Sequence, residues 1–210
     1  AGGVRYITKT LDVFVASVYL PPAMAKNAVP TSRKILSWLD GVISSLPSRC
    51  CPIICGDFNT RLEQTAENDC AIGPYVADGA PNQIYDAMVS RFLVQQKLCA
   101  INSHFPAGPT FFGTRQYRSR LDYIALPMAY LSRVRQCFVM LQSGDRLQLI
   151  AAAGRRDHRP VGADIDLRLR YNGDEQATRQ QWDFNRISSD LKKGGRDRDL
   201  FVREVEDEMK

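Results

Sequence analysis

The sequence of 210 residues lacks the signals that define several common classes of protein. It contains no apolar run close to the roughly 18 residues of a membrane-spanning helix, and no charged-then-apolar leader at its start. Its six cysteines form no C-x-x-C pair, which argues against a zinc knuckle or a thiol redox motif. No G-x-S-x-G segment supports a serine hydrolase. We therefore expect an intracellular protein without membrane contact, whose cysteines are reduced and buried.

The composition that remains is that of an ordinary globular domain, with 44% hydrophobic residues, 24% charged residues and a formal net charge of +5. Strand-like and helix-like segments alternate along the chain, which predicts a mixed α/β fold. The strand-like segments are 11–20, 52–55, 98–101, 110–112, 119–126, 133–141 and 163–169, and apolar residues recur at helical spacing over 31–46 and 85–96.

The segment 51–60, CPIICGDFNT, carries the clearest functional signal. Its short apolar run ends at a glycine, and Asp57 and Asn59 follow. A buried strand that ends in this way presents a carboxylate and an amide at the edge of a sheet, as active sites often do. The same residues also form plain turns, in which their side chains bond to nearby backbone. Two later segments, 119–124 (SRLDYI) and 157–161 (DHRPV), favour the first interpretation.

These three segments, in this order, resemble the motifs of the endonuclease/exonuclease/phosphatase superfamily, which includes abasic-site endonucleases and inositol-phosphate phosphatases. The first matches a GD-[apolar]-N motif, and Ser119–Tyr123 matches an S-x-[apolar]-D-[aromatic] motif. The third matches a closing S-D-H-x-P-V motif, except that Arg156 replaces the serine. The resemblance covers roughly 13–161. It implies a four-layer sandwich of two mixed β-sheets flanked by helices.

Hydrolysis of a phosphodiester requires an activated water, donors to the phosphate oxygens and help for the leaving alkoxide. Asp57 can orient and deprotonate the water, and Asn59 can donate to phosphate without adding negative charge. Protonated His158 can donate to phosphate, and Asp122 is the candidate partner for its other nitrogen, as the resemblance also implies. Tyr19 supplies a neutral donor if it faces the same edge. The sequence leaves open whether Asp57 or His158 is the base.

The resemblance also implies Mg²⁺ or Mn²⁺ as cofactor, with Asp157 as a metal ligand. Members of the superfamily carry a further glutamate ligand on an early strand, preceded by an asparagine. Residues 1–10 contain no acidic residue and no asparagine. We therefore expect the chain to be an N-terminally truncated portion of the fold, with a weakened cation site and with apolar sheet surface exposed.

Arginines surround the second and third motifs. They are Arg115, Arg118, Arg120, Arg156 and Arg159. If the motifs converge, these guanidinium groups attract a polyanion, because their geometry suits phosphate. Arginines in loops are often merely solvated, but the position of these beside two motifs favours a nucleic acid. We therefore expect DNA as the partner.

The composition changes after residue 171, so we divide the chain into a catalytic-type domain, 1–171, and a charged tail, 172–210. In the tail, Phe201, Val205 and Met209 recur at the spacing of an amphipathic helix. Its W-D pair and GRDRDLFVREVE segment resemble the connector between endonuclease and reverse transcriptase in non-LTR retrotransposons. An ordinary C-terminal helix is the alternative. The resemblance implies fusion to a reverse transcriptase and a nuclear location.

Three functions remain open at this point. The first is a metal-dependent phosphodiester hydrolase that acts as the DNA endonuclease of a retroelement-like protein. The second is a small-molecule phosphatase of the inositol-phosphate type, because a shared fold does not determine the substrate. The third is a catalytically dead remnant of the fold. The arginines and the tail favour the first.

Overall fold

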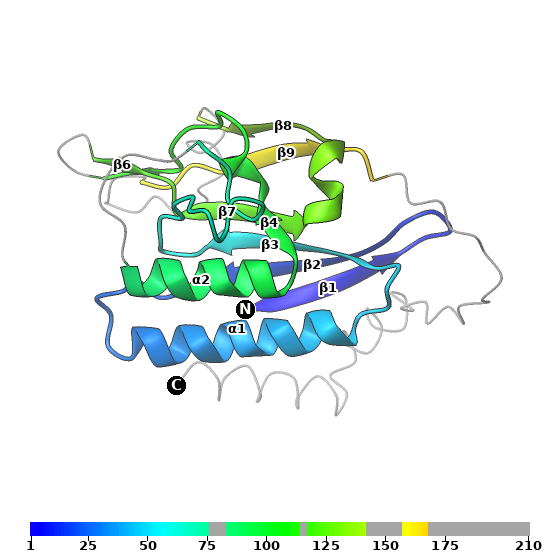
Figure 1. Cartoon of the computed structure of the whole chain (residues 1–210), viewed down its shortest axis with the longest axis horizontal. Helices are drawn as coiled ribbons and strands as arrows, with labels where there is room; N and C mark the ends of the chain where they lie inside the picture. The colour runs from blue at the N-terminus through cyan, green and yellow to red at the C-terminus, as the bar shows by residue number, and fades with distance from the viewer. Residues whose placement is uncertain (76–82, 114–116, 142–156, 168–210) are drawn as a thin grey trace, which may run out of the picture. The chain divides into compact units, whose positions relative to one another are not determined.

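The computed structural model describes residues 1–75, 83–113, 117–141 and 157–167. A five-stranded mixed sheet forms its centre (Figure 1). In the order β1-β2-β3-β7-β4, the strands span Gly2–Ile7, Asp12–Tyr19, Cys51–Asp57, Asp122–Pro127 and Leu98–Ala100. β2 and β3 are parallel, and every other neighbouring pair is antiparallel. The parallel strands therefore end at the same edge of the sheet.

Two helices, α1 (Ala28–Ser45) and α2 (Gln83–Gln95), lie side by side over one face of this sheet (Figure 1). From Phe14 onward β2 alternates, and Phe14, Ala16 and Val18 are buried beneath the helices because the side-chain period of a strand is two. The helices contribute Leu36, Leu39, Tyr85, Val89 and Leu93 to this core. No helix within the described ranges has the length and apolar content to cross a membrane.

The opposite face of the central sheet packs against an antiparallel pair, β8 (Val134–Val139) and β9 (Val161–Ile165). Cys137 of β8 belongs to a second apolar cluster with Ile124 of β7. The remaining short elements are η1 (Ile101–Ser103), β5 (Phe111–Phe112), β6 (Arg118–Ser119) and η3 (Met128–Arg133). Helices, central sheet and second sheet together form a layered α/β sandwich, which confirms the predicted fold class.

Three local features differ from the sequence-based expectation. The sequence pattern does not predict β1, because its tight turn to β2 has no glycine or asparagine; instead the Thr8 hydroxyl accepts the backbone N–H of Leu11 at 2.9 Å. α1 begins at Ala28, one turn before the predicted start. The predicted strand 119–126 is broken at Arg120, between β6 and β7. The predicted linker and helix of the tail lie outside the described residues.

Candidate active site

Three polar side chains form a row across one edge of the central sheet. Tyr19, the last residue of β2, pairs in register with Asp57, the last residue of β3, which pairs with Asp122, the first residue of β7. Residues paired in register share one face of a sheet. This face is the one away from the helices, because Val18 and Ile54 point into the helix-side core. Tyr19 is 56% exposed, and the two aspartates are partly buried.

The geometry around Asp57 follows from the residues on either side of it. A Cβ at Gly56 would lie 1.8 Å from the Val18 carbonyl oxygen, so only glycine allows this approach of the two strands. The chain then turns at Asn59, whose φ of 47° lies in the left-handed region that asparagine tolerates. The Asn59 N–H donates to Asp57 Oδ1 at 2.8 Å, and its Nδ2 donates to Asp57 Oδ2 at 3.0 Å and to the Leu20 carbonyl at 2.7 Å. Both carboxylate oxygens of Asp57 are therefore fixed.

His158 lies between the two aspartates. Its Nδ1 is 3.0 Å from Asp122 Oδ2, and its Nε2 is 3.9 Å from Asp57 Oδ2. Phe111 packs edge-on against the imidazole, with ring centroids 5.1 Å apart. The hydrogen bond to Asp122 raises the pKa of His158; burial opposes this, and the charges of Asp122, Asp57 and Asp157 raise the pKa further. The protonated ring, which donates from both nitrogens, is therefore favoured.

The Asp57 carboxylate has a different environment. Burial raises its pKa, the backbone hydrogen bond from Asn59 lowers it, and the charge of Asp122 raises it again. Asp57 is thus a partly desolvated carboxylate beside a second carboxylate, with His158 as its counter-charge. A carboxylate whose pKa is raised accepts a proton more readily, which suits a general base.

Two buried residues that the sequence analysis did not single out hold the backbone of Asp122. Thr110 Oγ1 accepts the N–H groups of Leu121 and Asp122, at 3.1 Å each. Asn102 Nδ2 donates to the Asp122 carbonyl at 3.0 Å. The Thr110 carbonyl also accepts the Arg159 N–H at 2.7 Å, so Thr110 joins the segments that carry Asp122 and His158. A threonine between a proline and two phenylalanines carries no sequence pattern that would have revealed this role.

Two of the five arginines predicted to bind nucleic acid lie beside Phe112. The guanidinium carbons of Arg118 and Arg159 are 5.8 and 5.9 Å from the centre of the Phe112 ring. Phe111, the preceding residue of β5, is the one that packs against His158, and its side chain points to the other face of the strand. Arg115 and Arg156 lie outside the described residues.

Arg120 contradicts the prediction that it contacts phosphate. Its side chain is 3% exposed, and its guanidinium donates to the backbone carbonyls of Gly108 and Tyr75. In an unbroken strand Arg120 would share a face with Asp122, but the break between β6 and β7 turns it inward. Arg120 therefore links two loops inside the protein.

The donor atoms of the site suit a divalent cation. Asp57, Asp122 and His158 each offer a ligand atom, and these atoms lie within 4.8 Å of one another. Carboxylate oxygens are the ligands that Mg²⁺ and Mn²⁺ prefer. Nδ1 of His158 is engaged by Asp122, so Nε2 is the ring nitrogen that remains to face a cation or a phosphate oxygen. Asp157, the predicted ligand, makes no side-chain hydrogen bond to a described residue, while its backbone carbonyl accepts the Phe112 N–H at 2.7 Å.

Comparisons with known proteins give matches among solved structures only; no family model and no curated protein matches the chain. A 3′-5′ exonuclease from Neisseria meningitidis aligns at 18% identity and a TM-score of 0.53, over 78% of this chain and 64% of its own. The endonuclease domain of TRAS1, a telomere-specific non-LTR retrotransposon, aligns at 18% identity and a TM-score of 0.49, over 79% and 61%. An endonuclease/exonuclease/phosphatase family protein from Leptotrichia buccalis aligns at 14% identity and a TM-score of 0.47, over 78% of this chain and 52% of its own.

The chain therefore has the endonuclease/exonuclease/phosphatase fold, as its three motifs predicted. It spans 52 to 64% of the length of these three structures. A likeness at such identity establishes the fold, and the activity has to be argued from the side chains of the site.

Proposed function

We propose that the chain is a metal-dependent phosphodiester hydrolase that acts as a DNA endonuclease. The observation that carries the proposal is the row of Tyr19, Asp57 and Asp122, closed by His158. A carboxylate base, a charged donor and a neutral donor converge at one edge of the sheet. Phosphodiester hydrolysis requires this combination, because a proton must leave the attacking water while charge develops on the phosphate oxygens.

Each side chain has a role in this proposal. Asp57, fixed by Asn59, accepts the proton of the water whose oxygen attacks phosphorus, and the bond from phosphorus to the leaving oxygen breaks. Protonated His158, which its hydrogen bond to Asp122 favours by raising the pKa of the ring, donates to a non-bridging phosphate oxygen. Asp122 fixes the ring through Nδ1. Tyr19 adds a neutral hydrogen bond to phosphate. The raised pKa of His158 is the reason for assigning the base to Asp57.

The cofactor in this proposal is Mg²⁺ or Mn²⁺, and Asp157 is the residue that would hold it together with substrate phosphate. When bound, the cation neutralises charge on the phosphate and the leaving oxygen. Binding calorimetry with Mn²⁺ tests this assignment independently of turnover: Asp157→Asn should weaken binding at least about tenfold. Unchanged Mn²⁺ affinity in this variant would remove Asp157 from the site.

The DNA partner is inferred from the cations around Phe112. Arg118 and Arg159 flank the Phe112 ring, so two guanidinium groups and an aromatic ring gather on the strand whose preceding residue, Phe111, packs against His158. Such a surface attracts the phosphate backbone and offers a face for stacking. We further propose that the chain belongs to a retroelement-like protein that acts in the nucleus, with a reverse transcriptase following the tail; the connector-like tail sequence supports this.

The test is a nicking assay on supercoiled plasmid with Mg²⁺, comparing the natural chain with Asp57→Ala. Loss of the base should lower the nicking rate by about 10² to 10⁴-fold. Asp69→Ala, which removes an exposed aspartate twelve positions along, is the matched control and should nick normally. Equal background from the natural chain and Asp57→Ala would reject catalysis by these residues and favour a dead remnant. Phosphate release from inositol phosphates without nicking would favour a small-molecule phosphatase.

A further inference from the structure

The hydroxyl of Tyr123 joins the two chain segments that carry the aspartates of the candidate active site. Tyr123 follows Asp122 in β7, so its side chain points to the opposite face of the sheet, into the helix-side core. Its hydroxyl accepts the Leu62 N–H at 2.9 Å and donates to the Arg120 carbonyl at 3.0 Å. Leu62 lies in the turn that follows Asp57, and Arg120 lies in the break that precedes Asp122. One buried hydroxyl therefore bridges the turn after β3 and the break before β7.

Ring packing also holds these two segments together beyond the end of the ladder, but it does not require the hydroxyl. The ladder between β3 and β7 ends at the pair of Asp57 and Asp122. Beyond it, the Phe58 N–H donates to the Leu121 carbonyl at 2.9 Å. The rings of Phe58 and Tyr123 meet edge-on, with centroids 5.9 Å apart. A phenylalanine in place of Tyr123 would keep this ring contact, so the contribution specific to tyrosine is the pair of hydrogen bonds.

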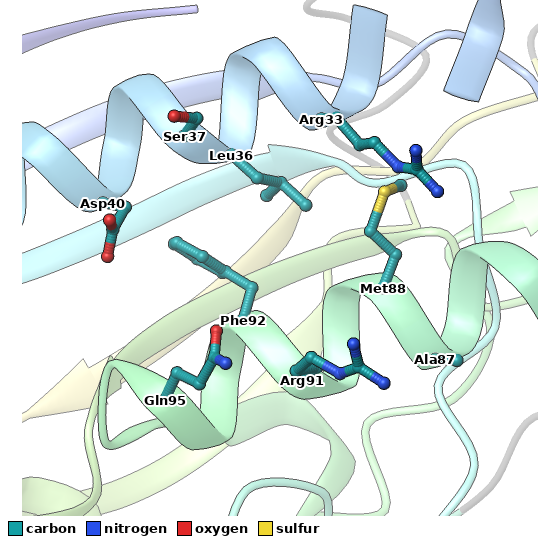
Figure 2. Close-up of a pocket in the computed structure, with 9 residues that line it drawn as sticks. All are labelled: Arg33, Leu36, Ser37, Asp40, Ala87, Met88, Arg91, Phe92 and Gln95. Atoms are coloured by element: carbon teal, nitrogen blue, oxygen red, sulfur yellow. The ribbon is translucent and has the colours of Figure 1, made fainter. Parts of the chain in front are cut away.

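The surroundings of the hydroxyl are shielded from water. Tyr123 is 2% exposed, and Leu62 is 4% exposed. The helix layer closes the same core: Leu36 of α1 and Phe92 of α2 point toward each other between the helices, and both are buried (Figure 2). Burial raises the pKa of Tyr123, so the hydroxyl stays protonated and can donate and accept at once. Loss of the hydroxyl leaves a buried N–H and a buried carbonyl oxygen without this partner, which is costly in such a core.

We propose that Tyr123 is a positioning residue, whose hydroxyl fixes the Asp57 carboxylate relative to Asp122 and His158. Both carboxylate oxygens of Asp57 accept hydrogen bonds from Asn59, so this carboxylate moves with the turn that contains Asn59. The hydroxyl of Tyr123 anchors the far end of that turn to the segment that carries Asp122. Without this anchor the turn relaxes, and the 3.9 Å separation between Asp57 Oδ2 and His158 Nε2 is no longer held.

The first test measures the turn itself and does not depend on catalysis. Amide hydrogen exchange is followed by NMR in the natural chain and in Tyr123→Phe, with the slowest amides of β2 as the measure of global stability. The amides of Leu62 and Asn59 should exchange at least about tenfold faster in the variant, beyond any change in β2, because one loses its acceptor and the other belongs to the released turn.

The matched control is Ser103→Ala, which removes another buried hydroxyl with the same two kinds of hydrogen bond. Ser103 Oγ accepts the Gly73 N–H at 2.8 Å and donates to the Ala100 carbonyl at 2.6 Å. Neither partner lies in the turn after β3 or in the break before β7. In this control the amides of Leu62 and Asn59 should therefore change no more than those of β2 do.

The second test measures the reaction, and it rests on the proposed function. The Tyr123→Phe variant should lower kcat for plasmid nicking at least about tenfold, because a small displacement of a catalytic group is expensive. Its KM should stay within about twofold of the natural value, since Tyr123 is buried and does not reach DNA. The Ser103→Ala control, compared at equal folded fraction, should keep the natural kcat. A kcat in Tyr123→Phe equal to that of the natural chain, or an equal loss in the control, would overturn the proposal.

The two tests separate this inference from the proposed function. If the natural chain does not nick, the proposed function fails, and hydrogen exchange still decides the role of Tyr123. Faster exchange at Leu62 and Asn59 supports positioning, and unchanged exchange at both overturns it. Circular dichroism melting checks that Tyr123→Phe folds. If it does not, para-aminophenylalanine in place of Tyr123 is the milder change, because an aniline nitrogen is a weaker acceptor than a phenol oxygen; the same two amides should exchange faster, and unchanged rates would again overturn the proposal.

Discussion

The Asp57 carboxylate accepts two hydrogen bonds from Asn59, which is also how an ordinary Asx turn is built. The two interpretations of this segment are therefore compatible: the turn is the device that holds the carboxylate. What separates the site from a plain turn is His158, which reaches Asp57 from a segment 101 positions later, so local sequence alone cannot settle the question. The motifs predicted which residues gather, and the fold shows how they do so. Asp57 and Asp122 lie at strand ends that are paired in register. His158 is held nearby by a β-bridge to Phe111.

We expect Asp122→Asn to lower the pKa of His158, because the hydrogen bond to the Asp122 carboxylate is the largest cause of its rise. The protonated fraction near neutral pH then falls, and nicking should slow at least about tenfold. Titration of the two histidines by NMR measures the shift, with His104 as internal reference. In the natural chain the raised pKa stabilises the fold below the ordinary histidine pKa, about 6.5, and this contribution is lost as pH rises through the folded-state value. The variant should therefore be least stable, relative to the natural chain, below about pH 6.5.

An unchanged His158 titration in Asp122→Asn would show that Asp122 does not control the ring. The effect of pH on stability offers a second check. Urea unfolding at pH 6 and pH 8.5 should show a larger difference between the two proteins at pH 6. The opposite order would contradict the assigned pairing.

Thr110→Val should destabilise the protein by about 2 kcal/mol, because two partly buried N–H groups lose their acceptor while the side-chain volume hardly changes. Thr110→Ser keeps the hydroxyl and should remain closer to the natural chain. Urea unfolding measures both. Nicking by the valine variant should also slow, because the start of β7 that carries Asp122 is no longer held. Equal behaviour of the two variants would show that the hydroxyl has no positioning role.

At the scale of whole elements, sequence patterns located β2, β3, α2 and the core of α1, because long apolar periodicity reports burial directly. Sequence patterns did not predict the local structure where single hydrogen bonds decide it. The β1–β2 turn depends on the Thr8 hydroxyl, and the break between β6 and β7 depends on Arg120 finding two backbone carbonyls. Neither feature has a composition signature. The register between two strands is also not visible in the sequence of either strand alone. Here the register between β2 and β3 places Tyr19 beside Asp57.

β1 is an edge strand of the central sheet, and it exposes apolar side chains: Val4 is 72% exposed and Tyr6 is 58% exposed. Such an edge pairs readily with other chains. We expect Val4→Lys to raise the concentration at which light scattering detects association, with a change in unfolding free energy within about 0.5 kcal/mol. Val18→Lys, on the buried face of the neighbouring strand, is the contrast and should unfold the protein. If Val4→Lys destabilised the chain as severely, the exposure of β1 would be contradicted.

At the scale of the whole molecule, charge placement matters more than the net charge of +5. We expect DNA affinity to fall with salt, and Arg118→Gln with Arg159→Gln to reduce the slope of log K against log salt by about 1.8, or about 0.9 for each phosphate that the protein no longer neutralises. The control, Lys9→Gln with Lys34→Gln, removes the same charge at exposed positions away from the row. Anisotropy titrations with a labelled duplex at several salt concentrations give both slopes. If the two double variants reduced the slope equally, DNA would respond only to net charge. A reduction specific to the arginines would instead locate the phosphate backbone along Phe112, the neighbour in β5 of the Phe111 ring that packs against the imidazole.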